Sequence, residues 1–183
     1  MTDHEAQNGP IFLKKMNESD ISSRYVEWLN NREHMRFSNQ RFKEHSLSTS
    51  REYLESFDQE NSLIFKIMRD KDFVGTISME IDKYNSVCVM GMLIGVEFSG
   101  QGIGIQSWNL GIDFAFSQKS VRKIKAGTAA SNIPMKRIFL KTRMSLEATL
   151  SSDLIIDDSP QDLLIYSRFS DELFQQEFVE IPS

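Results

Sequence analysis

The sequence predicts an α+β protein with a mixed, largely antiparallel sheet, and three observations support this. Hydrophobic and polar residues alternate over residues 63–96, which is the period-two pattern of half-buried strands. A glycine-rich segment at 100–104 then separates this region from an amphipathic stretch at 106–118. The 183 residues are 40% hydrophobic and 26% charged, an ordinary composition for a chain that buries one core. We therefore expect one domain spanning residues 1–183.

Capping signals predict where the helices begin. Asn17 and Asp20 resemble a capping box that opens the first helix, and Ser48 or Thr49 can cap the second. Asn132 caps a later helix that has a proline in its first turn, where a missing N–H is harmless. We expect helices over 17–29, 48–57, 106–118 and 132–141, and strands over 11–13, 63–67, 73–81, 87–96, 123–128, 145–156 and 162–169. Residues 1–9 are expected to be flexible, and 170–183 to form a tail or short helix capped by Ser170.

Charge and composition exclude several classes of function. The net charge is −5 and no basic block is present, so a nucleic-acid partner is not expected. No apolar stretch is long enough to cross a bilayer and the N-terminus lacks a signal pattern, so we expect a cytoplasmic protein without a membrane partner. Cys88 lies in an apolar run and is expected in the core. The three histidines and one cysteine lack the spacing of metal ligands, so no metal is predicted.

The glycines at 100, 102 and 104 are the most informative feature for function. A strand that leads through such a turn into a helix leaves several backbone N–H groups free at the positive end of the helix dipole. This favours binding of an anion such as a pyrophosphate. A Rossmann fingerprint is excluded because Ile105 follows Gly102 at the third position, and Gly100-Gln101-Gly102 excludes a P-loop. A flexible turn without a ligand is the alternative.

Two segments in this order resemble the GNAT acetyltransferases. Ser99-Gly100-Gln101-Gly102-Ile103-Gly104 is similar to the family's central Arg/Gln-x-x-Gly-x-Gly/Ala motif. The segment 132–144 resembles the second signature, in which an Asn begins a helix that ends in Lys-x-Gly-Phe. The N-terminal segment 20–30 resembles the branch with ribosomal-protein and amino-sugar acetyltransferases. The resemblance spans about 11–169 and implies the GNAT fold, a twisted sheet of about seven strands flanked by four to five helices.

Three departures from the family pattern affect the expected chemistry. Ser99 stands where Arg or Gln is usual, so one pyrophosphate contact is lost or supplied elsewhere. Arg143 and Met144 replace Gly-Phe, so the turn after that helix need not be left-handed. Phe139 stands where many relatives have a tyrosine that protonates the departing thiolate. A phenyl ring cannot donate that proton, so another group or water must do so.

The resemblance implies acetyl transfer from acetyl-CoA straight to an acceptor nitrogen, without a covalent enzyme intermediate. The pyrophosphate is expected on backbone N–H groups of the glycine loop, and a donor to the thioester carbonyl near the end of the preceding strand. Arg137 and Lys141 can meet the outer phosphates, although solvated helix charges are an equal alternative. The expected cofactor-binding residues are Ile94, Gly95, Val96, Gln101, Gly102, Ile103, Gly104, Ile105, Asn132 and Arg137.

A base must remove a proton from the acceptor amine, because alkyl amines are protonated at neutral pH. The candidates are Glu80, on the polar face of its strand, and His45, in the loop expected to border the acceptor; Asn132 completes the catalytic set. The alternatives are a solvated strand residue and a surface histidine. The residues expected to form the acceptor pocket are Trp28, Asn30, Arg36 and Arg41, with a mobile surface loop as the alternative.

The sequence therefore predicts an acetyl-CoA-dependent N-acetyltransferase that acts on a primary amine of a small molecule. A nucleotide-linked amino sugar is the preferred acceptor, because arginines beside aromatic rings suit phosphate and sugar. Two alternatives stay open: acetylation of protein N-termini, and a non-catalytic acyl-CoA-binding regulatory module. A homodimer is possible, but no segment demands one.

Overall fold

A twisted sheet of eight strands organises the described part of the chain, residues 7–8, 10–118 and 120–170 of the computed structural model. The strand order is β1-β2-β3-β4-β5-β6-β8-β7, and every neighbouring pair is antiparallel except β5 and β6. The strands are β1 (Gln7–Asn8), β2 (Ile11–Lys15), β3 (Ser62–Arg69), β4 (Asp72–Asp82), β5 (Val87–Ile94), β6 (Lys123–Ala129), β7 (Ser145–Ile156) and β8 (Ser159–Phe169). The predicted α+β class and mixed sheet are confirmed.

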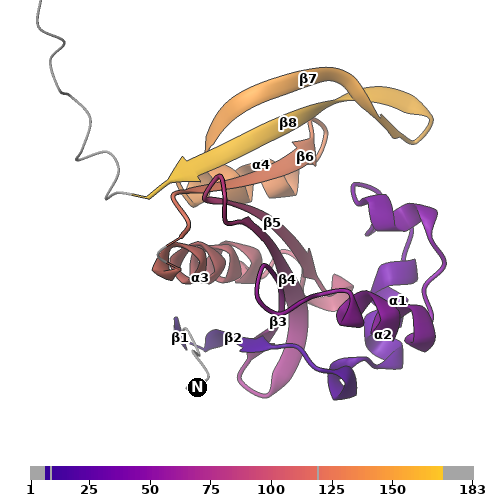
Figure 1. Ribbon diagram of the computed structural model, residues 1–183. Helices are drawn as coiled ribbons and strands as arrows, with labels where there is room; N and C mark the ends of the chain where they lie inside the picture. Colours follow the sequence, from indigo (N-terminus) through magenta and orange to yellow (C-terminus); the bar gives the residue numbers. More distant parts are fainter. Residues whose placement is uncertain (1–6, 9, 119, 171–183) are drawn as a thin grey trace, which may run out of the picture.

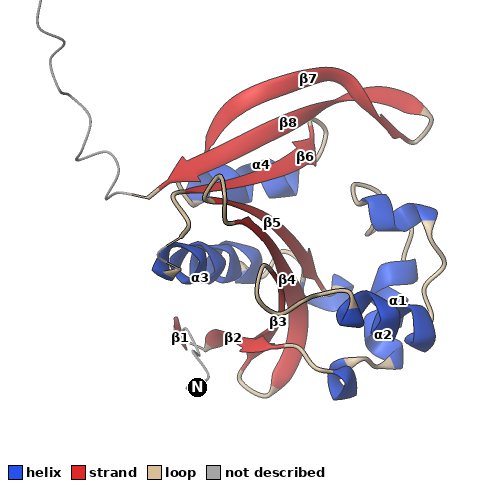
Figure 2. Cartoon of the chain, in the orientation of Figure 1, coloured by secondary structure: helices blue, strands red, loops and turns tan. Residues whose placement is uncertain are grey.

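Helices cover both faces of this sheet (Figures 1 and 2). The α-helices are α1 (Ser23–Asn30), α2 (Leu47–Glu55), α3 (Ile103–Ser117) and α4 (Ile133–Lys141), and three 3-10 turns are η1 (Glu18–Asp20), η2 (Asn39–Phe42) and η3 (Val96–Phe98). The helix α3 lies on one face of the sheet, and α1 and α2 lie on the other (Figure 1). The loop 31–46 connects α1 to α2.

The alternation in β4 decides which face of the sheet is core. Ile77 and Met79 are fully buried on the α3 side, where Met90 of β5 is also buried. Gly111 of α3 lets the helix pack closely here, because a Cβ at that position would lie 2.6 Å from the Met90 methyl group. Cys88 is also fully buried, as predicted, and burial raises the pKa of its thiol to about 12. It is a core residue and not a nucleophile.

Three helix starts differ from the sequence prediction. The Asn17–Asp20 capping box is present, but it closes the short turn η1, because Ile21 is extended and ends the helical conformation. The helix α1 begins separately after Ser22, whose side chain accepts from the Tyr25 N–H. Ser46, not Ser48 or Thr49, caps α2, and the third helix starts three residues earlier than expected, at Ile103. The first two segments offer several adjacent capping residues, so the sequence pattern alone does not choose among them, and α3 begins at Gly102 without any side-chain cap.

The turn after α4 is left-handed, a point that the sequence left open. Arg143 has φ of 60°, its N–H donates to the Leu140 carbonyl, and the next N–H, of Met144, donates to the Phe139 carbonyl. These two bonds form a Schellman motif with arginine in the position that favours glycine. The motif is retained because the Met144 side chain is buried and its sulfur accepts a hydrogen bond from the Trp108 indole at 3.1 Å.

The β7–β8 hairpin extends beyond the rest of the sheet, and its tip reaches toward the loop 31–46 (Figure 1). A two-residue turn joins the strands, and both Asp157 and Asp158 have positive φ. Positive φ at both central residues is the requirement of a type I′ hairpin turn. The helix expected after Ser170 lies outside the described residues, as do residues 1–6. Within the described ranges, no helix is both long and apolar enough to cross a membrane.

Candidate functional site

The strands β5 and β6 diverge along their length and open the sheet. They pair in parallel at only three positions, from Val87–Lys123 to Val89–Lys125. Beyond these pairs, β5 continues to Ile94 and β6 continues to Ala129, but the two strands no longer pair with each other. The far halves of two central strands therefore border an opening in the middle of the sheet.

Backbone groups of β5 point into this opening. The Gly95 N–H donates to the Val74 carbonyl at 2.8 Å, and the bonded pairs of an antiparallel ladder alternate. Gly95 is a bonded position, so Met92 and Ile94 are positions that make no hydrogen bond to β4. Their N–H and C=O groups therefore point away from β4 and toward β6. The N–H and C=O groups of Met92 and the N–H of Ile94 form an open strand edge that can pair with an extended ligand.

The glycine loop opens onto the same region. Gly100 and Gly102 have φ of 76° and 78°, and a Cβ built at either position would have no heavy atom within 4 Å. Gly102 is the N-cap of α3, so the first-turn N–H groups of that helix begin at Ile103 without a side-chain cap. The loop is thus an uncovered cradle of backbone N–H groups at a helix N-terminus, which suits an anion.

These parts belong to one cleft of about 1680 Å³. The glycine loop, the divergent halves of β5 and β6, and the start of α4 form one half of its lining. The other half comes from α1, α2, the loop between them and the open face of β4. We call the first the cofactor half (residues 90–139) and the second the acceptor half (residues 25–78). The cleft therefore joins an anion cradle to a separate polar chamber.

A sequence model described as an acetyltransferase (GNAT) domain matches residues 11–145, about three quarters of the chain. The chain belongs to the GNAT acetyltransferase family. It is an N-acetyltransferase that uses acetyl-CoA. No curated protein sequence matches it.

Solved structures of GNAT proteins share this fold. A ribosomal L7/L12 α-N-protein acetyltransferase, RimL, in complex with coenzyme A has a TM-score of 0.82 and 16% identity, over 90% of this chain and 96% of that one. A spermidine N-acetyltransferase from Vibrio cholerae, with CoA and spermine, has a TM-score of 0.81 and 19% identity, over 91% and 99%. The microcin C7 self-immunity acetyltransferase MccE, in complex with acetyl-CoA and AMP, has a TM-score of 0.78 and 20% identity. The match covers 89% of this chain and 94% of that one. These similarities establish the fold.

The cofactor half of this GNAT enzyme has the features that acetyl-CoA requires. The glycine cradle suits the pyrophosphate, and the open edge at Met92 and Ile94 suits the amide groups of the pantetheine arm. Of the predicted cofactor residues, Ile94, Val96, Gly102, Ile103, Gly104, Ile105, Asn132 and Arg137 line the cleft.

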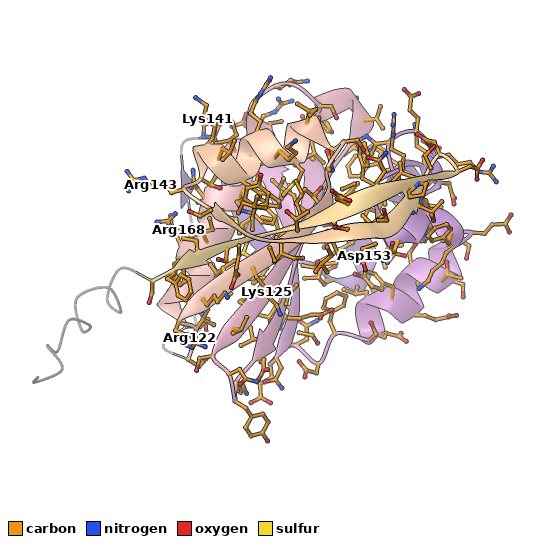
Figure 3. The ribbon with its side chains drawn as sticks, turned by 90° about the horizontal axis from the view of Figure 1, so that it is seen from above. Arg122, Lys125, Lys141, Arg143, Asp153 and Arg168 are labelled. Atoms are coloured by element: carbon orange, nitrogen blue, oxygen red, sulfur yellow. The ribbon has the colours of Figure 1, made fainter. Side chains whose placement is uncertain are left out.

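Two predicted cofactor residues do not line the cleft. The N–H of Gly95 is bonded to β4 and cannot serve as the donor expected for the thioester carbonyl. The Gln101 side chain turns away, since it donates to the Glu97 carbonyl at 2.9 Å and accepts from Arg69 at 2.6 Å. Lys141, the alternative phosphate contact, lies at the far end of α4 and points outward (Figure 3).

Asn132 lines the cleft, but its side chain has a structural role. Its Oδ1 accepts from the Met135 N–H at 3.2 Å and caps α4, and its Nδ2 donates to the Thr128 hydroxyl at 2.9 Å. Both polar atoms are therefore engaged, and Asn132 fixes the start of α4 against the end of β6.

The two predicted bases are placed differently. His45 lines the cleft, and its Nε2 lies 3.0 Å from the Gln40 carbonyl, within the same loop. Glu80 is exposed and does not line the cleft, because it lies one step beyond Ser78 on the polar face of β4. Its negative charge nevertheless raises the pKa of Tyr53, after the larger effect of burial.

His34 is a site residue that sequence reasoning missed. Its ring lines the cleft, and Nε2 lies 2.6 Å from the carbonyl of Ile94 at the open edge of β5. A carbonyl only accepts hydrogen bonds, so Nε2 carries the proton and Nδ1 keeps a lone pair in the neutral ring. This contact joins the acceptor half to the cofactor half. In the sequence, nothing distinguished His34 from the other histidines.

Trp28 and Asn30 support the cleft without lining it. Trp28 is only 3% exposed, and its ring fills the space beside Gly95, where a Cβ would approach to 2.4 Å. Its indole N–H donates to Glu97 at 2.9 Å. Asn30 donates to the His45 carbonyl and accepts from the His45 N–H, at 2.8 and 2.9 Å. The predicted role of Trp28 in binding the acceptor is therefore corrected to a core role, and Asn30 holds the loop.

Arg36 and Arg41 connect the loop 31–46 to the hairpin tip. Arg36 forms an ion pair with Asp157 at 3.0 Å, and Arg41 donates to the Ile155 carbonyl at 2.8 Å. We call these two contacts the clasp. Neither arginine lines the cleft, so the predicted grip on an acceptor phosphate is replaced by a link between two distant parts of the fold.

The acceptor half carries more negative than positive charge. Three glutamates line it, namely Glu33, Glu44 and Glu52. Among its described lining residues, positive charge comes from Lys43. Among the described residues, no group of three His, Cys, Asp or Glu side chains is arranged to hold a metal ion. The site is therefore built from backbone N–H groups on one side and an acidic polar chamber on the other.

Proposed function

We propose that this enzyme acetylates the primary amine of a small molecule. The observation that carries the proposal is the single cleft in which the glycine cradle and the open edge of β5 face the acidic acceptor half. Bound acetyl-CoA supplies an activated acetyl thioester to this cleft. The chain then has to hold an uncharged amine beside the thioester, which is chiefly a matter of position.

The role proposed for the backbone is to hold the cofactor. The N–H groups from Gly102 to Ile105 receive the pyrophosphate, and the edge at Met92 and Ile94 receives the pantetheine arm. Arg137 lines the cleft as an exposed cation and supports the outer phosphates. Ser99 also lines the cleft but contributes only a hydroxyl.

His34 is the base that the geometry favours. Its ring is held at the Ile94 carbonyl, where the two halves of the cleft meet, with an unprotonated Nδ1 in the neutral form. His45 is tied to its own loop, and Glu80 lies outside the cleft, so both predicted bases are less well placed. In the proposed mechanism, His34 accepts a proton from the acceptor ammonium, directly or through water.

Phe139 means that the departing CoA thiolate must obtain its proton from another source. Its ring is fully buried between Trp108 and Tyr166, with centroid distances of 5.4 and 4.9 Å. A phenyl ring has no proton to donate, so the thiolate takes its proton from water or from another group. This substitution is the main reason to include the non-catalytic module among the outcomes of the test.

The clasp contacts change which acceptor we prefer, because they occupy the two arginines that were expected to bind it. A nucleotide-linked amino sugar was expected because Arg36 and Arg41 could grip its phosphates, and both are engaged elsewhere. The three glutamates of the acceptor half also repel phosphate and favour an amine. We therefore place simple aliphatic amines first and the nucleotide-linked amino sugar behind them.

Release of free CoA in steady state, with acetyl-CoA and a panel of acceptors, tests the proposal. We expect turnover with small aliphatic amines and much less with a peptide N-terminus. Turnover confined to the peptide would assign the chain to protein N-terminal acetylation instead. Calorimetric binding of acetyl-CoA in the micromolar range without any turnover would favour the regulatory module.

A further inference from the structure

The two left-handed glycines of the anion cradle have no packing that fixes their shape. Gly100 and Gly102 have φ of 76° and 78°, and a Cβ at either position would meet no heavy atom within 4 Å. Glycine also loses more conformational freedom on ordering than any other residue. The cradle nevertheless has to keep several N–H groups directed at one anion. A contact from outside these two residues therefore has to hold the loop.

Gln101, between the two glycines, ties the loop to its surroundings. Its Nε2 donates to the Glu97 carbonyl at 2.9 Å, and its Oε1 accepts from a guanidinium nitrogen of Arg69 at 2.6 Å. The first bond closes the loop onto η3, and the second joins it to the end of β3, 32 positions earlier in the chain. A hydrogen bond from a charged donor is stronger than one between neutral groups. Both polar atoms of the Gln101 amide are thus engaged, on the side away from the cleft.

Both partners of Gln101 are themselves held by core residues. The Arg69 guanidinium lies 5.2 Å from the centroid of the Phe98 ring, and Phe98 is buried. The Glu97 carboxylate accepts from the indole N–H of Trp28 at 2.9 Å, and Trp28 is a core residue of α1. The amide of Gln101 is therefore fastened to two fixed parts of the fold, β3 and η3. We call Gln101 with its two hydrogen bonds the loop anchor.

We propose that Gln101 is a positioning residue for the cofactor, because the loop anchor holds the cradle in the shape that receives the pyrophosphate. Gln101 acts through the backbone on either side of it, and its own amide does not contact the cofactor. A cradle that is already ordered binds more tightly, because less conformational freedom is lost on binding. The proposal rests on the cofactor placement in the function proposed above, and it names the side chains that prepare that placement.

A double-mutant cycle, with the Kd of CoA measured by calorimetry, tests the loop anchor. Gln101→Ala and Arg69→Ala are each expected to raise the Kd of CoA about fivefold to tenfold. The double variant should bind at most about twofold more weakly than the poorer single variant, since either change opens the same contact. Gln118→Ala is the matched control and should keep the wild-type Kd. Gln118 lies at the other end of α3, outside the cleft lining, and its amide also makes a hydrogen bond, to the Ser117 hydroxyl.

Two further measurements separate positioning of the cradle from folding and from charge. Pantetheine has the arm of the cofactor but not its pyrophosphate, so its Kd should be the same in the wild type and in both single variants. The Tm of each variant should stay within about 2 °C of the wild type, because both bonds of the loop anchor are exposed. Gln101→Ala keeps the charge of Arg69, so its loss of affinity measures position and not attraction of the phosphates.

The outcomes separate this inference from the function on which it rests. No turnover with any amine, combined with non-additive losses of CoA affinity in the cycle, would overturn the proposed function and leave the loop anchor standing. An unchanged Kd in Gln101→Ala would overturn the loop anchor, even if Arg69→Ala lost affinity, because the charge alone would then account for the loss. Additive losses in the double variant, or an equal loss of pantetheine binding, would overturn it as well.

Discussion

Gly102 is the residue at which the anion cradle depends most on the absence of a side chain. Its φ of 78° is left-handed, and the space where a Cβ would lie is open. Any larger residue is strained there and projects into the cradle. We expect Gly102→Val to abolish acetyl-CoA binding in calorimetry. Ser99→Ala is expected to change the Kd less than threefold, and the opposite ranking would mean that side chains, not backbone N–H groups, hold the pyrophosphate.

His34 carries the prediction for catalysis. Removing a general base commonly costs about 10²–10⁴-fold in rate, so His34→Gln should lower kcat by at least 10²-fold while acetyl-CoA still binds. His45→Gln is the matched control, since this ring also lines the cleft and also meets a carbonyl through Nε2. Its kcat should fall less than tenfold. Equal losses in both variants would indicate that neither ring is the base.

The site residues that could be predicted are those whose contacts are local. The glycine loop and the Asn132 cap depend on neighbours within a few positions, so their sequence patterns were sufficient. Trp28, His34 and Arg41 depend on partners 69, 60 and 114 positions away, which no local pattern reveals.

At the scale of an element, the end of α4 contains a residue under strain. A left-handed conformation costs an L-residue about 1–2 kcal/mol, while glycine loses about 0.5–1 kcal/mol through its freedom in the unfolded chain. Arg143→Gly should therefore raise the free energy of unfolding by about 0.5–1 kcal/mol in denaturant titrations. Arg143 lies at the surface of this end of the molecule (Figure 3), so few contacts are lost.

Arg143→Ala separates backbone strain from the loss of the charged side chain. Alanine keeps the strain and removes the guanidinium, so this variant should not be more stable than the wild type. A gain as large as that of glycine would mean that the arginine side chain, and not its φ, is unfavourable.

The strands were predicted better than the helix ends, for a physical reason. Alternation in a strand such as β4 records a two-sided environment along eleven residues, so a shift of one residue is readily detected. A helix start depends on one hydrogen bond, and Ser46, Ser48 and Thr49 can all make it. The turn at Arg143 could not be predicted, because burial of Met144 outweighs the local preference for glycine.

At the scale of the whole molecule, acid sensitivity is expected from carboxylates that hold turns. Asp58 accepts from the N–H groups of Glu60, Asn61 and Ser62, and these bonds lower its pKa. Asp82 holds the β4–β5 turn in the same way. A folded-state pKa below the unfolded value, about 3.9, means that the native state binds fewer protons. The stabilisation is complete above that pH and is lost as the pH falls further.

Thermal unfolding between pH 6 and pH 2 measures this effect. The Tm should decline below about pH 4, and Asp58→Asn should decline less steeply, because an amide still accepts the bonds but does not titrate. Asp153→Asn, on the exposed strand β7, is the control and should follow the wild type. A parallel decline in all three proteins would locate the acid sensitivity elsewhere.

The clasp has a consequence for the time at which the site is completed. Arg41 and Ile155 are 114 positions apart, so during synthesis the loop 31–46 emerges long before the hairpin that holds it. At about 5–20 residues per second, the delay is roughly 6–23 s. The acceptor half is therefore among the first parts of the enzyme to be made and among the last to be held in place. A nascent chain can form the cofactor cradle while its acceptor chamber is still open on one side.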